Sequence, residues 1–367
     1  MRPTELVISL SVIEDNYRAL RAKIPQDVKT MAVVKADAYG HGLVPVARRL
    51  EKAGVDMFAV ALLEEAVALR RSGIVRPILV LGGILAEDAG EAVRWDVSPA
   101  VYDDRVLMAL EEAAVRQGTA ANAHLKVDTG MSRVGVQPGR ELTHLLGCWR
   151  DCPSVHMQGA FTHFAAAGSD AYFTHKQDAA FRRALDDIRY AGFSPIAHEA
   201  ATEACLKDEY QLDMVRLGIG LYGYLVPELA GKIKMAQLLR TRPVRIDSIR
   251  AGETVSYGRT FRAQRDTRVM TVPIGYGDGY PRPLSNRAEA LVHGVRVPVI
   301  GRVCMDMLML DVTDVTDVCL TDEVVLLGPQ GADAITAEEL AEYAETIPYE
   351  ILLGFTDRVR RVFVDEI

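Results

Sequence analysis

A lysine stands where a strand is expected to end. Lys35 follows the apolar run Met31–Val34 and precedes the small and polar segment Ala36–Gly42. In barrel enzymes the carboxyl ends of the strands carry the chemistry, and a lysine held against apolar groups has a lowered pKa that suits it to form a Schiff base. A lysine that reaches into solvent from this rim is the simpler alternative, so Lys35 is a candidate that needs further support.

Polar side chains follow the later apolar runs of the chain as well. Lys126 and Asp128 close the fifth run, His163 closes the sixth, Thr202 follows the seventh and Arg216 lies in the eighth. Each of them has an ordinary structural role open to it, such as an ion pair, a buried imidazole, a helix cap or a clamp between strands. Several such groups on one rim nevertheless favour a functional site.

Two loops offer a binding place for a phosphate. Thr202 lies after the seventh run and Gly218–Ile219 lie after the eighth, where barrels often hold a phosphate on backbone N–H groups. A phosphate-bearing cofactor together with a Schiff-base lysine indicates pyridoxal 5'-phosphate (PLP). The same spacing fits a lysine-dependent aldolase that acts on a sugar phosphate, and the residues alone leave both hypotheses open.

The elements that position these residues follow from the hydrophobic pattern. Short continuous apolar runs alternate with helical patterns such as Pro45–Ala53 and Glu64–Ser72, as expected for parallel strands buried on both faces. The candidate strands are Met31–Ala36, Met57–Ala61, Pro77–Gly82, Val97–Val101, His124–Asp128, Met157–His163, Ile196–Ala200 and Met214–Gly220. Eight strands in about 250 residues predict an α/β fold with an N-terminal (β/α)8 barrel of the TIM type, although a doubly wound open sheet shows the same alternation.

The pattern changes after about residue 236. Strands rich in β-branched residues, for example Arg245–Ile249 and Arg268–Ile274, replace the helical period and are separated by Gly, Asp and Pro clusters. One helix is expected near Thr336–Ala344. We therefore expect a cofactor-binding barrel domain over residues 1–235, whose first ten or so residues could pair with the other domain, and a mostly β C-terminal domain over residues 236–367.

Composition and charge limit the partners and the compartment. Lys and Arg number 42 against 50 Asp and Glu, and the net charge of −8 argues against a nucleic-acid partner. The cysteines have no spacing typical of zinc or disulfide frameworks, which predicts reduced thiols, a cytoplasmic protein and no metal site; they are Cys148, Cys152, Cys205, Cys304 and Cys319. Since there is no signal-peptide pattern and no apolar run of about 20 residues, no membrane segment is expected.

Several blocks of the sequence resemble those of one enzyme family. The segment Val33–Gly42 closely resembles the PLP-lysine motif of alanine racemases. Other blocks that look like this family's follow in its order: Lys126–Met131 with Arg133, Thr162–Phe164, Met214–Arg216 with Gly218–Ile219, Val255–Gly258, Ile274–Tyr276, Gly301–Asp306 and Pro348–Glu350. The resemblance implies a PLP enzyme of fold type III, with a barrel, a β-rich C-terminal domain and a head-to-tail homodimer with shared active sites. It also implies an isomerase that interconverts L- and D-alanine, either to supply D-alanine for peptidoglycan precursors or to consume it.

The resemblance further implies two catalytic bases, one on each face of the amino-acid substrate. Lys35, which holds the cofactor, would serve one face, and Tyr257 of the partner subunit would serve the opposite face. Tyr257 would contact His163, which meets Arg216, and Arg216 would face the pyridine nitrogen of the cofactor. Because arginine does not readily give up a proton, this nitrogen would stay unprotonated.

Binding roles are implied by the same resemblance. Arg133 would meet the phenolic oxygen of the cofactor and the substrate carboxylate, and the backbone of Met305 would be a second carboxylate contact. Lys126 resembles the family's lysine that can be carbamylated and then orients Arg133. Tyr276, with Tyr349, would narrow the entrance and favour a small side chain. The residues that would hold the phosphate are Tyr39, Thr202, Gly218, Ile219 and Tyr349.

One block departs from the family pattern. After His198, these racemases commonly carry Asn and then Ser, whereas this chain has Ala201 and Thr202, followed by Glu203. A PLP-dependent racemase of serine or of broader amino-acid specificity is therefore an alternative. A non-catalytic PLP-binding carrier is a further hypothesis, but such a carrier has no use for Tyr257 or for an added β domain.

Overall fold

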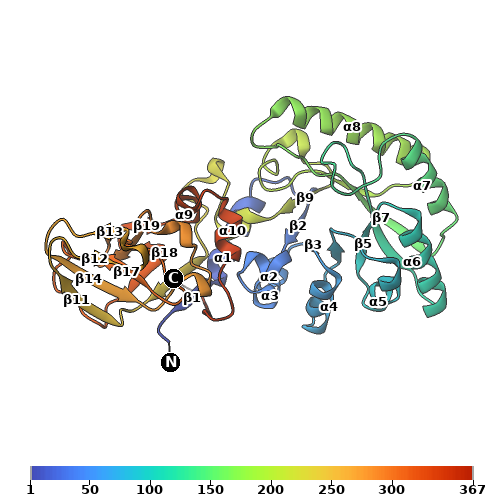
Figure 1. Ribbon diagram of the computed structural model, residues 1–367. Helices are drawn as coiled ribbons and strands as arrows, with labels where there is room; N and C mark the ends of the chain where they lie inside the picture. The colour runs from blue at the N-terminus through green and yellow to red at the C-terminus, as the bar shows by residue number, and fades with distance from the viewer. Residues whose placement is uncertain (1, 366–367) are drawn as a thin grey trace. The chain divides into compact units, whose positions relative to one another are not determined.

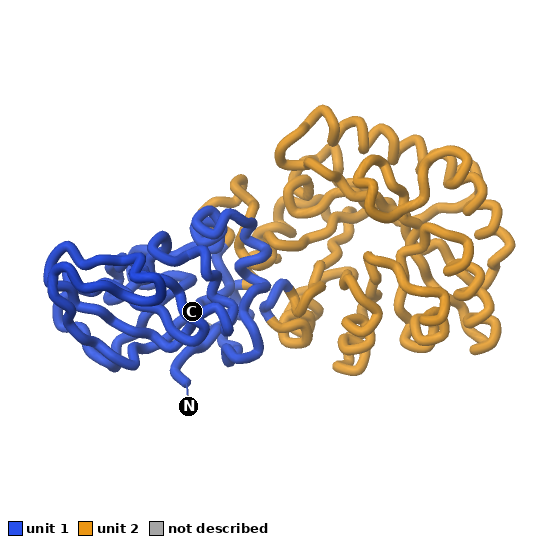
Figure 2. The backbone as a smooth tube through the Cα atoms, in the orientation of Figure 1, with its two compact units in different colours: residues 1–12, 39–41, 234–367 blue, residues 13–38, 42–233 orange. Residues whose placement is uncertain are grey.

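A computed structural model describes residues 2–365 of the chain (Figure 1). The chain divides into two compact units (Figure 2). The first, called here the β unit, comprises Met1–Val12, Tyr39–His41 and Lys234–Ile367. The second, called the barrel unit, comprises Ile13–Ala38 and Gly42–Ile233.

Eight parallel strands form the centre of the barrel unit (Figure 1). They are β2 (Lys29–Val33), β3 (Met57–Val60), β4 (Ile78–Val80), β5 (Ser98–Val101), β6 (Ala121–Lys126), β7 (Val155–Phe161), β8 (Ile196–His198) and β9 (Met214–Leu217), paired in the order β8-β7-β6-β5-β4-β3-β2-β9. The N–H of Asp213 donates to Ala197 O at 3.1 Å and the N–H of Arg216 donates to Ala200 O at 3.0 Å, so the outermost strands meet. The nearly closed ring confirms the predicted barrel and excludes the open sheet.

Helices connect these strands and cover the outside of the barrel (Figure 1). After α1 (Leu10–Arg21) they are α3 (Leu43–Ala53), α4 (Leu63–Arg71), α5 (Ala89–Arg94), α6 (Asp104–Gln117), α7 (Arg140–Arg150) and α8 (Ala171–Tyr190). In α6, apolar residues at helical spacing, among them Val106, Leu110 and Ala114, are buried. Asp103 begins this helix by accepting a hydrogen bond from Val106 N, and Gly118 ends it in the left-handed conformation.

Several strand boundaries differ from the expected ones, and β2 and β6 are two examples. β2 ends at Val33, and the residues from Lys35 onward form a separate turn rather than more strand. β6 begins at Ala121, before the expected His124, because its first residues pair with the start of β7 although they are less apolar. Backbone pairing across strands therefore extends an element beyond the run that hydrophobicity alone marks.

The β unit is built from three sheets and the helices α9 (Ala337–Ala344) and α10 (Pro348–Leu353). The largest sheet contains β16 (Val295–Pro298), β15 (Glu289–Val292), β18 (Val324–Gln330), β10 (Gln237–Thr241), β1 (Glu5–Ser9) and β20 (Arg360–Val364) in that order, with β19 (Asp333–Ile335) beside β18. The smaller sheets are β11 (Arg245–Ile249), β14 (Thr267–Val272) and β17 (Leu308–Asp311), and the pair β12 (Thr254–Val255) and β13 (Phe261–Arg262). β1 pairs antiparallel with β10 and parallel with β20, so the N-terminal strand is part of this sheet.

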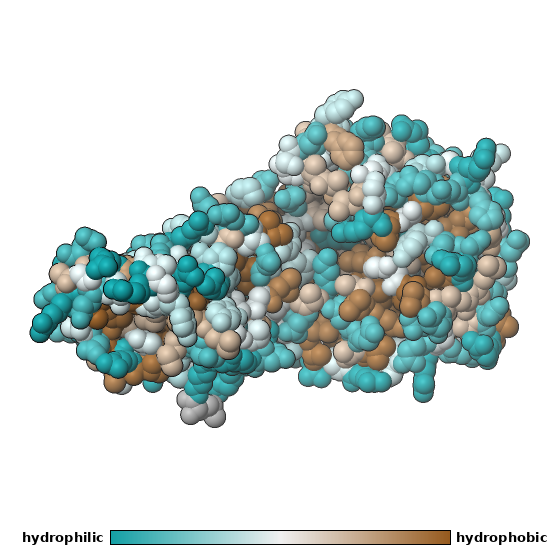
Figure 3. Space-filling view, viewed as in Figure 1, coloured by the Kyte–Doolittle hydropathy of each residue, from teal (hydrophilic) through white to brown (hydrophobic). Residues whose placement is uncertain are grey.

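The surface mixes hydrophilic and hydrophobic residues. Figure 3 shows the two kinds interspersed over the visible face. Within residues 2–365, no helix combines the length and the apolar character needed to cross a membrane.

Candidate active site

The turn that carries Lys35 is left-handed. In α2 (Lys35–Tyr39) the three residues after the lysine have φ angles of 52°, 54° and 54°. Outside glycine this conformation costs roughly 1–2 kcal/mol per residue, so it persists only where other contacts hold it. One such contact is the hydrogen bond that Leu43 N donates to Asp37 Oδ1 at 2.7 Å.

Glu65, in the first turn of α4, anchors the same turn. Its Oε1 accepts a hydrogen bond from Ala36 N at 2.5 Å, and its Oε2 accepts from Ala61 N at 2.8 Å and from Leu62 N at 3.1 Å. One carboxylate thus joins the start of α4 to the residue beside Lys35. This role was not expected from the sequence, although a glutamate at the third position of a helix is a known capping signal.

Lys35 is half-buried, and its pKa is lowered. Burial is the largest cause; the charge of Arg133 lowers the pKa further, the carboxylate of Glu65 opposes this, and the charge of Arg216 adds to the lowering. A lowered pKa is the shift expected for a lysine held against apolar groups at a strand end. A larger share of neutral amine is then available to attack a carbonyl group.

Arg216 on β9 is buried and donates several hydrogen bonds through its two terminal nitrogens. Its Nη1 donates to His198 Nδ1 at 2.8 Å and to His198 O at 3.1 Å. Its Nη2 donates to Glu199 O at 2.7 Å, to Thr162 O at 2.9 Å and to His163 Nδ1 at 3.2 Å. Burial lowers the pKa of Arg216 to about 10, so the guanidinium stays charged at neutral pH. These bonds tie the ends of β7, β8 and β9 together.

The histidines around Arg216 are neutral, and their tautomers follow from their partners. Because arginine can only donate, His163 and His198 accept at Nδ1 and carry their proton on Nε2. His198 Nε2 then donates to His124 Nδ1 at 2.9 Å, and His124 Nε2 donates to Gln158 Oε1 at 3.2 Å. Burial, followed by the charge of Arg216, lowers the pKa of His163 to about 2. His163 therefore keeps an Nε2–H group that can donate.

Lys126, at the end of β6, is a buried amine. Burial lowers its pKa to about 7, with the charge of Arg216 as the next cause, while Asp128 opposes the shift. Its Nζ donates to Val127 O at 3.3 Å and lies 4.9 Å from the ring centre of Phe161. A large share of this amine is neutral, and hence nucleophilic, slightly above neutral pH.

Asp128 orders the loop that carries Arg133. Its Oδ1 accepts hydrogen bonds from the N–H groups of residues 130–132 at 2.9, 2.9 and 3.1 Å. Arg133 itself is exposed, and its charge lowers the pKa values of three other candidates. The barrel unit thus brings within electrostatic reach of one another five residues predicted from the sequence: Lys35, Lys126, Arg133, His163 and Arg216.

Thr202 meets the segment that follows β9. Its Oγ1 accepts hydrogen bonds from Gly218 N at 3.0 Å and from Gly220 N at 3.5 Å. Because the oxygen accepts in both contacts, the hydroxyl proton is left to donate to an anion. Gly218 directly precedes the short 3-10 helix η3 (Ile219–Tyr222). The two loops named as a phosphate-binding place therefore lie in contact.

The remaining candidates lie in the β unit. The rings of Tyr39 and Tyr349 have centroids 5.9 Å apart with their planes at 44°. Tyr257, Tyr276 and Met305 are exposed, with 71%, 42% and 52% of their surface accessible. Their exposure leaves these three side chains accessible to another chain.

Hydrogen bonds hold together the segments that carry Tyr257, Tyr276 and Met305. Ser256 Oγ donates to Arg302 O at 2.6 Å and lies 3.4 Å from Cys304 Sγ. Tyr276 N donates to Cys304 O at 3.0 Å, and Gly277 N donates to Met305 O at 2.8 Å. The segments that carry Tyr257, Tyr276 and Met305 are therefore neighbours in space, although they are far apart in sequence.

Comparison with known proteins identifies the family. A model of the alanine racemase N-terminal domain matches residues 8–226, and a model of the C-terminal domain matches residues 236–363. The alanine racemase of Symbiobacterium thermophilum is 42% identical over 378 residues, which cover 100% of this chain and 98% of that protein. The chain belongs to the alanine racemase family.

Solved alanine racemases share the fold. The structure of the Bacillus anthracis alanine racemase with bound L-Ala-P has a TM-score of 0.92 and 36% identity, covering 99% of this chain and 95% of that one. The Bartonella henselae alanine racemase with covalently bound pyridoxal phosphate has a TM-score of 0.89 and 27% identity, covering 99% of this chain and 100% of that one.

The block that departs from the alanine racemase pattern is accommodated without a buried extra charge. Thr202 keeps a hydroxyl group, and its oxygen already bonds to Gly218 N. Glu203 is exposed and lies against Gly168, where an added Cβ would come 3.0 Å from Glu203 Oε1.

Proposed function

We propose that this chain is a PLP-dependent alanine racemase that interconverts L-alanine and D-alanine. The observation that carries the proposal is the cluster in the barrel unit, where Lys35 has a lowered pKa and is influenced by the donor-only Arg216. The match to the family over the whole chain supports alanine as the substrate. When bound, PLP delocalises the negative charge that develops at the substrate Cα once its proton is removed.

The residues of the barrel unit fit this cofactor by their chemistry. A lysine with more neutral amine suits the aldehyde, Arg216 can only donate to the pyridine nitrogen, and the Thr202 hydroxyl proton suits a phosphate oxygen. We assign the phosphate to the residues named from the sequence: Tyr39, Thr202, Gly218, Ile219 and Tyr349.

We assign the two proton transfers to Lys35 and to Tyr257 of the partner subunit. The Lys35 amine takes or returns the Cα proton on one face, and the Tyr257 phenol serves the other face, which inverts the centre. The exposure of Tyr257 supports its use by another chain. The neutral His163 supports the same role, because its Nε2–H can donate to the phenol oxygen and stabilise the phenolate.

Substrate binding is assigned to a guanidinium and a backbone group. Arg133 holds the substrate carboxylate, for which its planar fork of donors is suited, and the backbone of Met305 is the second contact. Lys126, as a carbamate, would be an anion able to orient Arg133; its lowered pKa supports this modification. Tyr276, with Tyr349, narrows the entrance in favour of a small side chain.

We further propose a head-to-tail homodimer in the cytoplasm that supplies D-alanine for peptidoglycan precursors. The exposed group of Tyr257, Tyr276 and Met305 supports a contribution across subunits. The five unpaired thiols of the chain support a reducing compartment. Neither a nucleic acid nor a membrane is required as a partner.

A panel of L-amino acids incubated with the holoenzyme tests the proposed function. We expect D-alanine to form with kcat/KM at least about tenfold above that for D-serine, since a narrow entrance penalises a larger side chain. Borohydride reduction should fix the cofactor on Lys35, and Lys35→Ala should form no D-alanine, while Lys176→Ala, which removes an exposed lysine of α8, should act as wild type. Faster D-serine formation, or cofactor fixed on another lysine, would overturn the assignment.

A further inference from the structure

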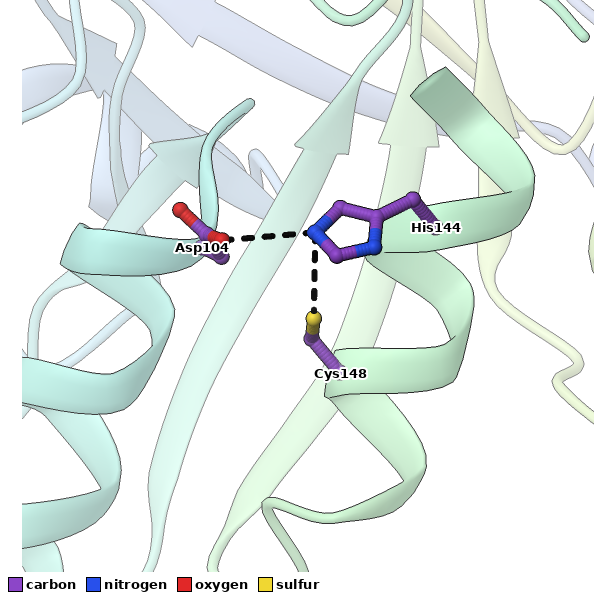
Figure 4. A group of neighbouring side chains, drawn as sticks. All are labelled: Asp104, His144 and Cys148. Carbon is purple, nitrogen blue, oxygen red and sulfur yellow. Dashed lines mark hydrogen bonds and ion pairs between the residues drawn. The ribbon is translucent and has the colours of Figure 1, made fainter. Parts of the chain in front are cut away.

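Three side chains with metal-binding donor atoms meet on the outer helices of the barrel unit. Asp104 is the first residue of α6, and His144 and Cys148 lie one turn apart on α7 (Figure 4). The side chains point toward one another, and their three donor atoms all lie within 4.8 Å of one another. None of the three was assigned a role in the active site.

The distances match those between ligands of one tetrahedral zinc ion. His144 Nε2 lies 3.3 Å from Asp104 Oδ2 and 3.7 Å from Cys148 Sγ. Zinc binds nitrogen and oxygen at about 2.0–2.1 Å and sulfur at about 2.3 Å, so tetrahedral neighbours lie about 3.3 Å apart for nitrogen and oxygen and about 3.6 Å apart for nitrogen and sulfur. Two of the three donor pairs are therefore spaced as ligands of one such ion would be, and the third pair lies within 4.8 Å.

The arrangement differs from that of a Cys–His–Asp catalytic group. In a catalytic group the nucleophile and the carboxylate bind opposite nitrogens of the imidazole. Here the carboxylate and the thiol both contact Nε2 of His144 (Figure 4). The three donor atoms instead lie close to one another, as the ligands of a single cation do.

We propose that Asp104, His144 and Cys148 bind one zinc-class transition-metal ion, whose fourth position is open to water. Imidazole and thiolate ligands select Zn²⁺ and Co²⁺ over Mg²⁺ and Ca²⁺, which take oxygen ligands. Binding replaces the S–H bond of Cys148 with a sulfur–metal bond and releases the proton to solvent. The thiolate and the carboxylate of Asp104 then neutralise the charge of the divalent ion.

Local structure presents these donors to solvent. The side chain of His144 is 67% exposed and that of Asp104 is 39% exposed, so an ion can reach both. Asp103 caps α6 with its own carboxylate, which leaves Asp104 available for other contacts. Cysteine spacing alone predicts no metal site here, because the third ligand lies on another helix, 40 positions before His144.

Calorimetric titration with zinc chloride tests the site on holoenzyme dialysed against a chelator. We expect one Zn²⁺ per chain, an affinity at least about tenfold weaker in His144→Ala and in Cys148→Ser, and a heat that varies with the ionisation enthalpy of the buffer because a proton is released. Magnesium chloride should give no binding. Since these side chains are not buried, both variants should keep the cofactor absorbance and the melting temperature of the wild type.

Cys319 supplies the matched control. Its Sγ lies 3.0 Å from Asp322 Oδ1, and His293 Nε2 lies 3.0 Å from the other oxygen, Oδ2. The same three residue types are therefore present, but the thiol and the imidazole contact different oxygens of the carboxylate. Cys319→Ser should leave zinc affinity unchanged, and Zn²⁺ should slow alkylation of Cys148 by iodoacetamide at least about tenfold without slowing that of Cys319. The absence of zinc binding to the wild type, unchanged affinity in Cys148→Ser or His144→Ala, or protection of Cys319 instead of Cys148 would overturn the proposal.

Discussion

Arg216 and Lys126 are two buried basic groups of one site whose pKa values differ. Arg216 donates to carbonyl groups and imidazoles at the ends of two neighbouring strands, β7 and β8. It keeps its charge, because even a pKa lowered to about 10 lies above physiological pH. The pKa of Lys126 falls to about 7, since its ordinary value is lower and burial acts on it as well. One rim thus holds a permanent cation and an amine that titrates near neutrality.

We expect Lys126 to take up carbon dioxide as the pH rises. Only the neutral amine attacks CO₂, forming an N–C bond and releasing one proton, and its pKa of about 7 makes the amine neutral above that pH. Carbon-13 NMR of the holoenzyme with labelled bicarbonate should show one carbamate signal per chain that grows from about pH 6 to about pH 8. The signal should vanish in Lys126→Ala and persist in Lys207→Ala; equal signals at both pH values would count against the carbamate.

The reactive residues could be predicted from the sequence more readily than the residues that hold them in place by hydrogen bonds. Lys35, His163 and Arg216 could be inferred as neighbours because each lies in or just after an apolar run, and parallel strands end on one rim. The His124–His198 hydrogen bond could not be inferred, because it joins residues 74 positions apart and depends on the pairing of strands. Sequence reports which residue types end a strand and says little about which of them touch.

At the scale of elements, the turn after β2 shows how tertiary contacts override local preference. The apolar run predicts a strand through Ala36, yet Ala36 and the residues after it are left-handed. Alanine does not favour this conformation and aspartate adopts it only occasionally, so contacts such as the hydrogen bonds of Glu65 and Asp37 are needed to hold it. The barrel itself was predictable from eight apolar runs, whereas its closure depends on the hydrogen bonds between β8 and β9.

We expect Glu65→Gln to loosen this turn and to lower the pKa of Lys35 further. Glutamine is neutral, so the variant lacks the charge-assisted hydrogen bonds of the carboxylate, which are worth about 1.5–3 kcal/mol each. It also lacks the negative charge that raises the pKa of Lys35 in the wild type. Cofactor affinity should fall about tenfold or more, and the alkaline limb of the titration that follows Lys35 should move to lower pH. Glu64→Gln, at the exposed neighbouring position, should leave both quantities unchanged; equal effects of the two variants would refute a specific anchor.

At the scale of the whole molecule, the residues assigned to the reaction are divided between the two units. Lys35 and Arg216 belong to the barrel unit, and Tyr257 and Met305 belong to the β unit. We propose two domains, one over residues 1–235 and one over residues 236–367. Strand β1, although it lies at the start of the first range, joins the sheet of the second domain, and its pairing with β10 and β20 supports this. The homodimer was implied only by resemblance, because neither composition nor periodicity reports which surface meets a partner.

Mixed dimers provide the decisive measurement for shared active sites. Lys35→Ala removes one base and Tyr257→Phe removes the other, so each variant alone should be nearly inactive. After exchange at equal amounts, half of the dimers should be mixed, and one of the two sites in each would combine an intact Lys35 with an intact Tyr257 of the partner subunit. We expect about one quarter of the wild-type racemase activity to return. Activity that stays at the level of the separate variants, with mixed dimers proven by mass spectrometry, would contradict catalysis by two chains at one site.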